Sequence, residues 1–147
     1  MAGIKRTSEA VWNGTGMEGS GTLSSTSGVL NQTPYSFKAR FQNEDGKAGT
    51  NPEELIAAAH AGCYAMQLSF MLTGAGFAPT SLDAKSTLEM DQVEGGFKIA
   101  RIKLSVVGTV PSISAEQFDE LATKAKEICP VSQALSALPI TLDAKLA

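Results

Sequence analysis

Metal-binding side chains are scarce in this 147-residue chain, which contains two cysteines and a single histidine. The cysteines, Cys63 and Cys129, are too far apart in the sequence for a CxxC redox loop or a compact zinc knuckle. With only one histidine to add, they are a poor ligand set for structural zinc. We therefore expect no metal ion. The spacing leaves one arrangement open, in which the fold brings the two cysteines together from separate helices.

A basic surface and an export segment are also lacking. The net charge is −3, the isoelectric point is about 5.1, and the basic residues never form a run. We therefore expect neither nucleic acid nor a membrane surface as a partner. The segment Met1–Gly14 has no apolar core, so it does not resemble a signal peptide. We expect a cytoplasmic protein, in which a permanent structural disulfide is unusual.

One long apolar stretch is present, Leu55–Phe77, but it is not typical of a membrane span. His60, Gln67 and Thr73 interrupt it, and alanine and glycine make up much of the rest. A membrane span is expected to be richer in leucine, isoleucine and valine. The composition instead favours a buried core helix.

Periodic patterns along the chain predict a single α+β domain over residues 1–147. The expected elements are extended segments from Met1 to Phe41 with a strand at Tyr35–Phe41, a helix capped by Asn51 and ending at Gly74, strands from Leu82 to Met90 and from Phe97 to Val106 with a β-bulge near Arg101, an amphipathic helix starting at Ser114, a short helix at Val131–Leu138, and a strand from Ile140 to Leu146. This order is typical of a mainly antiparallel sheet with a long central helix.

The helix that begins after Asn51 carries small or apolar residues on nearly every side. One sheet covers only one face of such a helix, so the other faces need a second partner. Ala57, Ala61 and Gly62 keep its surface slim, which lets another helix approach closely. We therefore expect a homodimer in which two copies of this helix pack together.

The two cysteines differ in their expected surroundings. Cys63 lies in the middle of the long helix, where a free cysteine is commonly a small, inert core residue. Cys129 directly precedes Pro130, at the start of the short third helix. A helix N-terminus presents partial positive charge to a thiolate, and cysteine is not a favoured capping residue. Cys129 is therefore the less easily explained as structural.

Two cysteine motifs resemble those of one known family. The segment Thr50–Cys63, TNPEELIAAAHAGC, looks like the signature around the first cysteine of the OsmC/Ohr family, the osmotically inducible and organic hydroperoxide resistance proteins. The segment Cys129–Ser132, CPVS, resembles the second-cysteine motif, while SGVLNQ at 27–32 and PYSF at 34–37 resemble the OsmC branch. The resemblance covers essentially the whole chain in the right order and spacing.

This resemblance implies an intertwined homodimer with two active sites at the subunit interface, and peroxidase activity on organic hydroperoxides more than on hydrogen peroxide. It implies that Cys63 attacks the peroxide and becomes a sulfenic acid, which Cys129 then resolves to a disulfide. An external dithiol, such as dihydrolipoamide or a lipoylated protein, would reopen that disulfide by exchange. No bound cofactor is implied. The alternative is a non-enzymatic stress or ligand-binding dimer with inert core cysteines.

The resemblance also implies that an arginine and a glutamate accompany the attacking thiolate. Glu53 matches the glutamate of the family's Asn-Pro-Glu motif, although helix capping is an alternative role that suits Glu54 better. Arg40 is our candidate cation, because it precedes the loop to the Cys63 helix; a solvated arginine is the equal alternative. About 15 Å of helix rise separates Glu53 from Cys63, so any contact requires the dimer interface or a long arginine.

His60 lies one turn before Cys63 on nearly the same face. It could support a thiolate or belong to a Cys–His hydrolase, but the sequence offers no positioned acid partner and no exposed nucleophile turn. A histidine packed at an interface is the favoured interpretation. Tyr64, Met66, Phe70 and Met71 are most simply core residues, and some could line an apolar pocket for the alkyl part of a hydroperoxide.

Overall fold

A computed structural model describes residues 3–147 of the chain, which divide into two compact units, Met1–Leu55 and Ile56–Ala147. The boundary falls in the first turns of the long helix α2, Pro52–Gly74. Each unit is considered by itself below. The single domain expected over residues 1–147 stays a prediction, and the extended conformation expected at Met1 and Ala2 lies outside the described residues.

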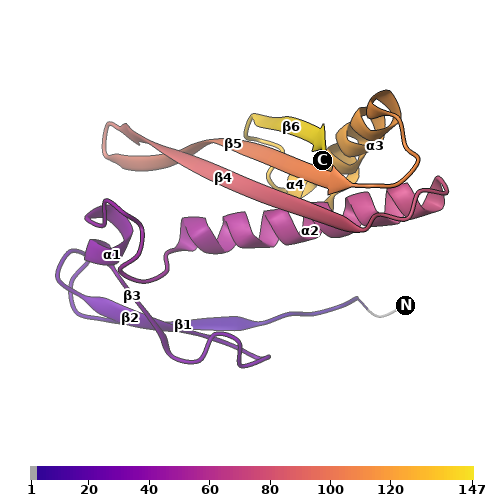
Figure 1. The fold of residues 1–147 in the computed structure, drawn as a ribbon. Helices are drawn as coiled ribbons and strands as arrows, with labels where there is room; N and C mark the ends of the chain where they lie inside the picture. The colour runs from indigo at the N-terminus through magenta and orange to yellow at the C-terminus, as the bar shows by residue number, and fades with distance from the viewer. Residues whose placement is uncertain (1–2) are drawn as a thin grey trace. The chain divides into compact units, whose positions relative to one another are not determined.

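The first unit contains a three-stranded antiparallel sheet and a short helix (Figure 1). Its elements are β1 (Ser8–Asn13), β2 (Ser20–Ser25), β3 (Thr33–Ser36) and α1 (Phe37–Phe41). Gly21 pairs with Trp12 on one side and Tyr35 on the other, and the two aromatic rings have centroids 5.3 Å apart. A Cβ atom at Gly21 would lie 2.7 Å from the Tyr35 ring. Glycine is therefore needed where these rings meet over β2.

The expected strand at Tyr35–Phe41 is wrong beyond Ser36, because the chain turns there into α1. The Ser36 hydroxyl accepts a hydrogen bond from the Ala39 backbone N–H at 3.1 Å, which caps the new helix. Serine at an N-cap satisfies a donor that would otherwise lack a partner. Arg40 consequently lies on a helix and not on a strand. Over so short a segment, the alternation of apolar and polar residues did not distinguish a helix from a strand.

The second unit contains the remainder of α2 with the elements β4 (Ser81–Val93), β5 (Gly96–Thr109), α3 (Ala115–Ile128), α4 (Pro130–Ala134) and β6 (Ile140–Leu146). Strands β4 and β5 form a long antiparallel hairpin, and β6 joins β5 in parallel. Helix α3 packs beside β6 and α4 (Figure 1). The mainly antiparallel α+β fold predicted from the sequence is confirmed.

Several local predictions are also confirmed. The Asn51 side chain accepts a hydrogen bond from the Glu54 N–H at 2.8 Å, which caps α2, and the helix ends at Gly74. The register of the hairpin shifts beside Arg101, where the bulge was expected. The helix expected at Val131–Leu138 is shorter and spans Pro130–Ala134. Beyond it, Ser136 and Leu138 donate to carbonyl oxygens three residues earlier, which is a pattern of turns. Leu138 also precedes Pro139, a position disfavoured in a helix.

One core joins α2, α3 and the inner face of the β4–β5–β6 sheet. Every second residue of the middle of β5 is buried, and the residues of the core are Tyr64, Leu68, Leu72, Leu104, Val106, Val110, Phe118, Ala122, Ala125 and Cys129. Along α2 the buried residues recur every fourth position from His60 to Leu72, so they form one face. Met66 and Phe70 lie outside this face and are 63% and 68% exposed.

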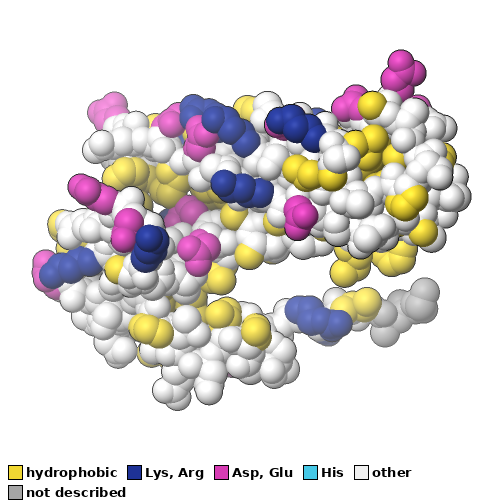
Figure 2. All heavy atoms as spheres, in the orientation of Figure 1, with side chains coloured by type: hydrophobic (Ala, Val, Ile, Leu, Met, Phe, Trp, Pro, Cys, Tyr) yellow, Lys and Arg dark blue, Asp and Glu magenta, His cyan; other side chains and the backbone are white. Residues whose placement is uncertain are grey.

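The surface combines apolar and charged side chains. Figure 2 shows lysines and arginines interspersed with acidic side chains over the face drawn, together with exposed hydrophobic groups. Helix α2 is long and apolar enough to meet the composition criteria for a membrane span. Met66 and Phe70 are exposed, so the second unit by itself does not cover α2 on all sides. The expected second copy of the chain against α2 stays a prediction.

We predict that Ser114→Ala lowers the free energy of unfolding by about 1 kcal/mol. The Ser114 hydroxyl accepts a hydrogen bond from the Gln117 N–H, and the Gln117 side chain bonds back to the Ser114 N–H, forming a capping box at the start of α3. Urea unfolding followed by circular dichroism measures the change. Ser136→Ala, at an exposed turn, is the control, and equal stabilities of the two variants would contradict the capping role.

Candidate active site

The two cysteines are in contact. Cys63 lies on α2, Cys129 lies between α3 and α4, and their sulfur atoms are 3.1 Å apart with the Cys129 thiol donating to Cys63. Both are free thiols, and a disulfide bond would bring the sulfurs to about 2.05 Å. Cys129 is fully buried, whereas Cys63 is half-buried. The fold thus brings together the pair that the sequence left open.

The chain turn at Cys129 explains how this contact arises. The Cys129 N–H donates to the carbonyl oxygen of Ala125, so the residue ends α3. Pro130 then occupies the first position of α4, where its missing N–H costs no helical hydrogen bond. Cys129 therefore stands at the corner between two helices, and its side chain reaches α2.

The immediate surroundings of Cys63 favour its neutral form. Burial raises the pKa of the Cys63 thiol, and the contact with the neighbouring Cys129 thiol raises it further. A hydrogen bond with the backbone of Val131 lowers the pKa and offsets part of the effect. Among the described residues, no cation contributes to this shift. A reactive thiolate at neutral pH therefore needs a positive charge from elsewhere.

A second polar contact crosses from α2 to α4. The Nε2 atom of His60 lies 2.7 Å from the Ser132 hydroxyl, and both residues are buried. Burial lowers the pKa of His60, which favours the neutral imidazole. The Nδ1 atom of His60 is buried without a hydrogen-bond partner among the described residues. This contact gives His60 a serine partner and not the acid expected of a hydrolase.

Arg40 and Glu53 form a two-point ion pair in the first unit. The Arg40 Nε and Nη2 atoms lie 3.1 Å and 2.5 Å from the two carboxylate oxygens of Glu53. The Arg40 side chain is 36% exposed, and its guanidinium lies 4.7 Å from the centre of the Phe41 ring. This planar arrangement fixes the orientation of the arginine. Glu54 instead accepts from the Thr50 hydroxyl and donates its N–H to Asn51, as expected for capping.

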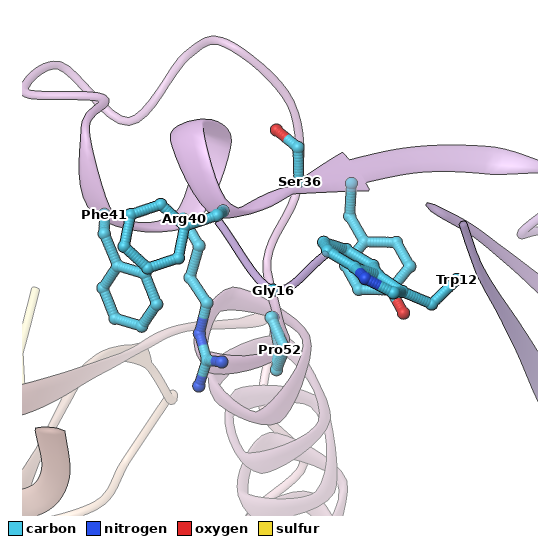
Figure 3. Close-up of a pocket in the computed structure, with 8 residues that line it drawn as sticks. Trp12, Gly16, Ser36, Arg40, Phe41 and Pro52 are labelled. Carbon is cyan, nitrogen blue, oxygen red and sulfur yellow. The ribbon is translucent and has the colours of Figure 1, made fainter. Parts of the chain in front are cut away.

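An apolar cavity of about 250 Å³ lies next to Arg40 (Figure 3). Its walls come from β1, β3, α1 and the start of α2, and the lining residues are Trp12, Gly16, Tyr35, Ser36, Phe37, Arg40, Phe41 and Pro52. The aromatic rings in this lining suit an apolar group rather than an ion. Sequence reasoning placed the apolar pocket among α2 residues and missed this one.

The structure places the predicted site residues in two pairs that belong to different units, Cys63 with Cys129 and Arg40 with Glu53. Sequence reasoning missed Ser132, although it lies within the CPVS motif, because a serine there carries no pattern of its own. Tyr64 is a core residue, with its hydroxyl donating to the Ala122 carbonyl at 3.2 Å. Within residues 3–147, no group of three or more His, Cys, Asp or Glu side chains could hold a metal ion.

Comparisons with known proteins decide the family. A family model described as OsmC-like protein matches residues 44–144. The chain is 51% identical to peroxiredoxin OsmC of Escherichia coli K12 over 143 residues, which cover 97% of each chain. The chain belongs to the OsmC family. An OsmC-family relative, organic hydroperoxide resistance protein OhrB of Bacillus subtilis, is 30% identical over 78% of this chain and 80% of its own length.

Solved structures show that the fold is that of the OsmC family. The crystal structure of Bacillus subtilis OhrB has a TM-score of 0.69 at 26% identity and covers 96% of this chain and 98% of its own. An OsmC-like protein of Mycoplasma pneumoniae has a TM-score of 0.74, with 98% of each chain covered. At 21% identity, this second likeness shows the fold alone.

We predict that burial of the only histidine makes stability depend on pH. The pKa of His60 is lowered from 6.5 on folding, so the unfolded chain binds its proton more readily. This contribution to stability is fully present above the unfolded pKa and is lost as the pH falls below it, by at most about 1.4 kcal/mol per pH unit. Urea unfolding between about pH 7.5 and 5.5 tests this. His60→Gln should have a smaller slope, and an unchanged slope would contradict the prediction.

Proposed function

We propose that this OsmC-family protein is a thiol peroxidase that reduces organic hydroperoxides to alcohols. The observation that carries the proposal is the 3.1 Å contact between the sulfurs of Cys63 and Cys129. Two thiols so close can exchange between a dithiol and a disulfide with little movement. The relatives named peroxiredoxin OsmC and organic hydroperoxide resistance protein OhrB support the reaction class.

The reaction proceeds in three balanced steps. The Cys63 thiolate attacks the terminal peroxide oxygen, the O–O bond breaks, and the alkoxide takes a proton and leaves as the alcohol. Cys63 is then a sulfenic acid, and the Cys129 sulfur attacks it to form the disulfide with loss of water. An external dithiol reduces this disulfide by two exchange steps and becomes a disulfide itself.

We assign the roles of the two cysteines from their burial. Cys63 is half-buried, so a peroxide can reach its sulfur, whereas Cys129 is fully buried. Cys63 is therefore the attacking residue and Cys129 the resolving residue.

Arg40 supplies the charge that Cys63 lacks, and it does so across a homodimer. Within one chain, the ten residues of helix between Glu53 and Cys63 give a rise of about 15 Å, too far for direct contact. A second copy packed on the exposed face of α2 would bring its own Arg40 to Cys63. Glu53 would orient that arginine by its two-point ion pair. The cavity beside Arg40 would then hold the alkyl or aryl group of the substrate.

We also propose that a dithiol is the reductant and that the protein works in the cytoplasm. A dithiol is required because a single thiol would leave a mixed disulfide to be resolved separately. Dihydrolipoamide or a lipoylated protein fits this chemistry, and the reducing cytoplasm is where such a cycle operates. The exposed apolar face of α2 is assigned to the second copy and not to a membrane, because His60, Gln67 and Thr73 interrupt the helix.

We predict that the two cysteine variants fail differently. Cys63→Ser should consume no peroxide, because no other nucleophile is placed to attack. Cys129→Ser should consume about one equivalent and then stall or over-oxidise, because its sulfenic acid has no resolving thiol. Single-turnover mass spectrometry with cumene hydroperoxide separates these outcomes. Identical behaviour of the two variants would show that the roles are wrongly assigned.

We predict that Arg40→Met raises the pKa of Cys63 and slows the peroxidase. The substitution keeps much of the side-chain length but removes the charge that favours the thiolate. Arg40→Lys should recover only part of the rate, because lysine cannot bridge a thiolate and a carboxylate with a planar group. The pH dependence of Cys63 alkylation by iodoacetamide, followed by mass spectrometry, measures the pKa.

Two controls accompany the Arg40 experiment. Lys38→Met removes an exposed charge from the same helix and should leave the alkylation profile unchanged. A mixed dimer of Arg40→Met and Cys63→Ser chains should regain activity, because it unites an intact Cys63 with an intact Arg40 from the other chain. If Arg40→Met alkylates like the parent protein, Arg40 is an ordinary surface arginine and the activating cation lies elsewhere.

A further inference from the structure

Helix α2 makes two neighbouring contacts with the segment formed by Cys129 and α4. Cys63 and Cys129 form one, with sulfurs 3.1 Å apart, and His60 and Ser132 form the other at 2.7 Å. His60 precedes Cys63 by three residues, and Ser132 follows Cys129 by three. Residues three apart on a helix are neighbours on one face, so His60 lies one turn from Cys63. Ser132 lies in the first turn of α4, directly after Cys129 at its N-cap.

The polar contact is directional, whereas the rest of this core is mainly apolar. His60 and Ser132 are 0% and 5% exposed, and they are the buried polar residues of the described chain. A buried polar group without a partner is costly, so the pair favours one position of α4 on α2. Helix α4 spans only five residues and is too short to be stable by itself. Its position therefore depends on contacts such as this one.

We propose that His60 and Ser132 are positioning residues that hold Cys129 within reach of Cys63, so that disulfide formation outpaces over-oxidation. The inference rests on the proposed peroxidase function, which it extends to the resolving step. Neither residue takes part in bond making. Their contact fixes the start of α4, and with it the Cys129 sulfur.

Two reactions compete for the oxidised Cys63. In the first, the Cys129 thiol attacks the sulfenic acid, an S–S bond forms, and water leaves. In the second, another hydroperoxide oxidises the sulfenic acid to a sulfinic acid and is itself reduced to the alcohol. Only the first depends on where Cys129 lies, and a displacement of about 1 Å can slow a positioned reaction up to a hundredfold. The ratio of the two products therefore reports the placement of Cys129.

A matched set of variants isolates the hydrogen bond. Ser132→Thr keeps the hydroxyl and Ser132→Val removes it, with nearly equal side-chain shapes. His60→Leu combined with Ser132→Ala removes both partners and leaves no buried group without a bond. Tyr64→Phe is the control, because it removes a buried hydrogen bond between α2 and Ala122 of α3 and keeps the His60–Ser132 hydrogen bond.

The first measurement titrates each variant with cumene hydroperoxide and reads disulfide and sulfinic acid by intact mass. We expect Ser132→Val and the double variant to reach half over-oxidation at about tenfold lower peroxide than the parent protein. Ser132→Thr and Tyr64→Phe should behave like the parent protein. The initial rate of Cys63 thiol loss is measured for every variant and used to normalise the curves, because a displaced α4 also disturbs the hydrogen bond between Cys63 and the Val131 backbone. Over-oxidation curves that coincide for Ser132→Thr and Ser132→Val would overturn the inference.

A second measurement needs no peroxide and so separates this inference from the proposed function. Equilibration of the Cys63–Cys129 pair with oxidised and reduced dithiothreitol gives the effective concentration of one thiol at the other. Ser132→Val should lower that value about tenfold, which makes the reduction potential about 30 mV less negative. An unchanged potential would contradict the positioning role. A parent protein that forms the disulfide here but does not react with hydroperoxide would contradict the peroxidase proposal alone.

Discussion

The proposed function of this protein depends on the contact between the sulfurs of Cys63 and Cys129. Its two residues are far apart in the sequence, so the fold must bring them together. The chain leaves β5, forms α3, turns at Cys129 into α4, and returns as β6 in parallel with β5. This crossover places the corner at Cys129 against the middle of α2. The capping box of α3, Pro130 and the shared core together determine where that corner lies.

Burial holds the two cysteines in contact, but it also disfavours the Cys63 thiolate that the proposed reaction needs. Burial and the neighbouring thiol both raise the pKa of Cys63, yet the attacking species must be the thiolate. No cation among the described residues offsets this shift, so the proposed reaction needs a positive charge from beyond the immediate neighbours of Cys63. Arg40 is oriented by Glu53 and lies beside an apolar cavity. The exposed apolar face of α2 offers a surface where a second copy would deliver that arginine. Dimerisation and thiolate activation are thus parts of one hypothesis.

Sequence reasoning predicted the elements whose patterns are long or whose caps are distinctive. The helix capped by Asn51, the capping box at Ser114 and the final strand all have local signals in consecutive residues. Helix α1 was missed because a segment of five residues shows no reliable period, and the cap at Ser36 looks like any strand serine.

Contacts between distant residues were harder to predict. The cysteine pair was expected only through the family resemblance, since spacing alone left it open. The His60–Ser132 bond and the aromatic cavity beside Arg40 join residues from separate elements, and no local pattern in the sequence marks them. The resemblance implied that Glu53 and an arginine, for which Arg40 was the candidate, accompany the thiolate, but the helix that carries Arg40 was not predicted. Local chemistry thus predicted the elements, and tertiary packing decided which of their side chains meet.

The most direct test of the central hypothesis counts free thiols after reaction with one equivalent of an organic hydroperoxide. If Cys63 and Cys129 are a redox pair, the protein should lose both thiols, release one equivalent of alcohol, and recover both thiols on addition of dihydrolipoamide. If both thiols persist while the hydroperoxide remains intact, the cysteines are inert core residues. The protein would then be a non-enzymatic stress or ligand-binding member of its family.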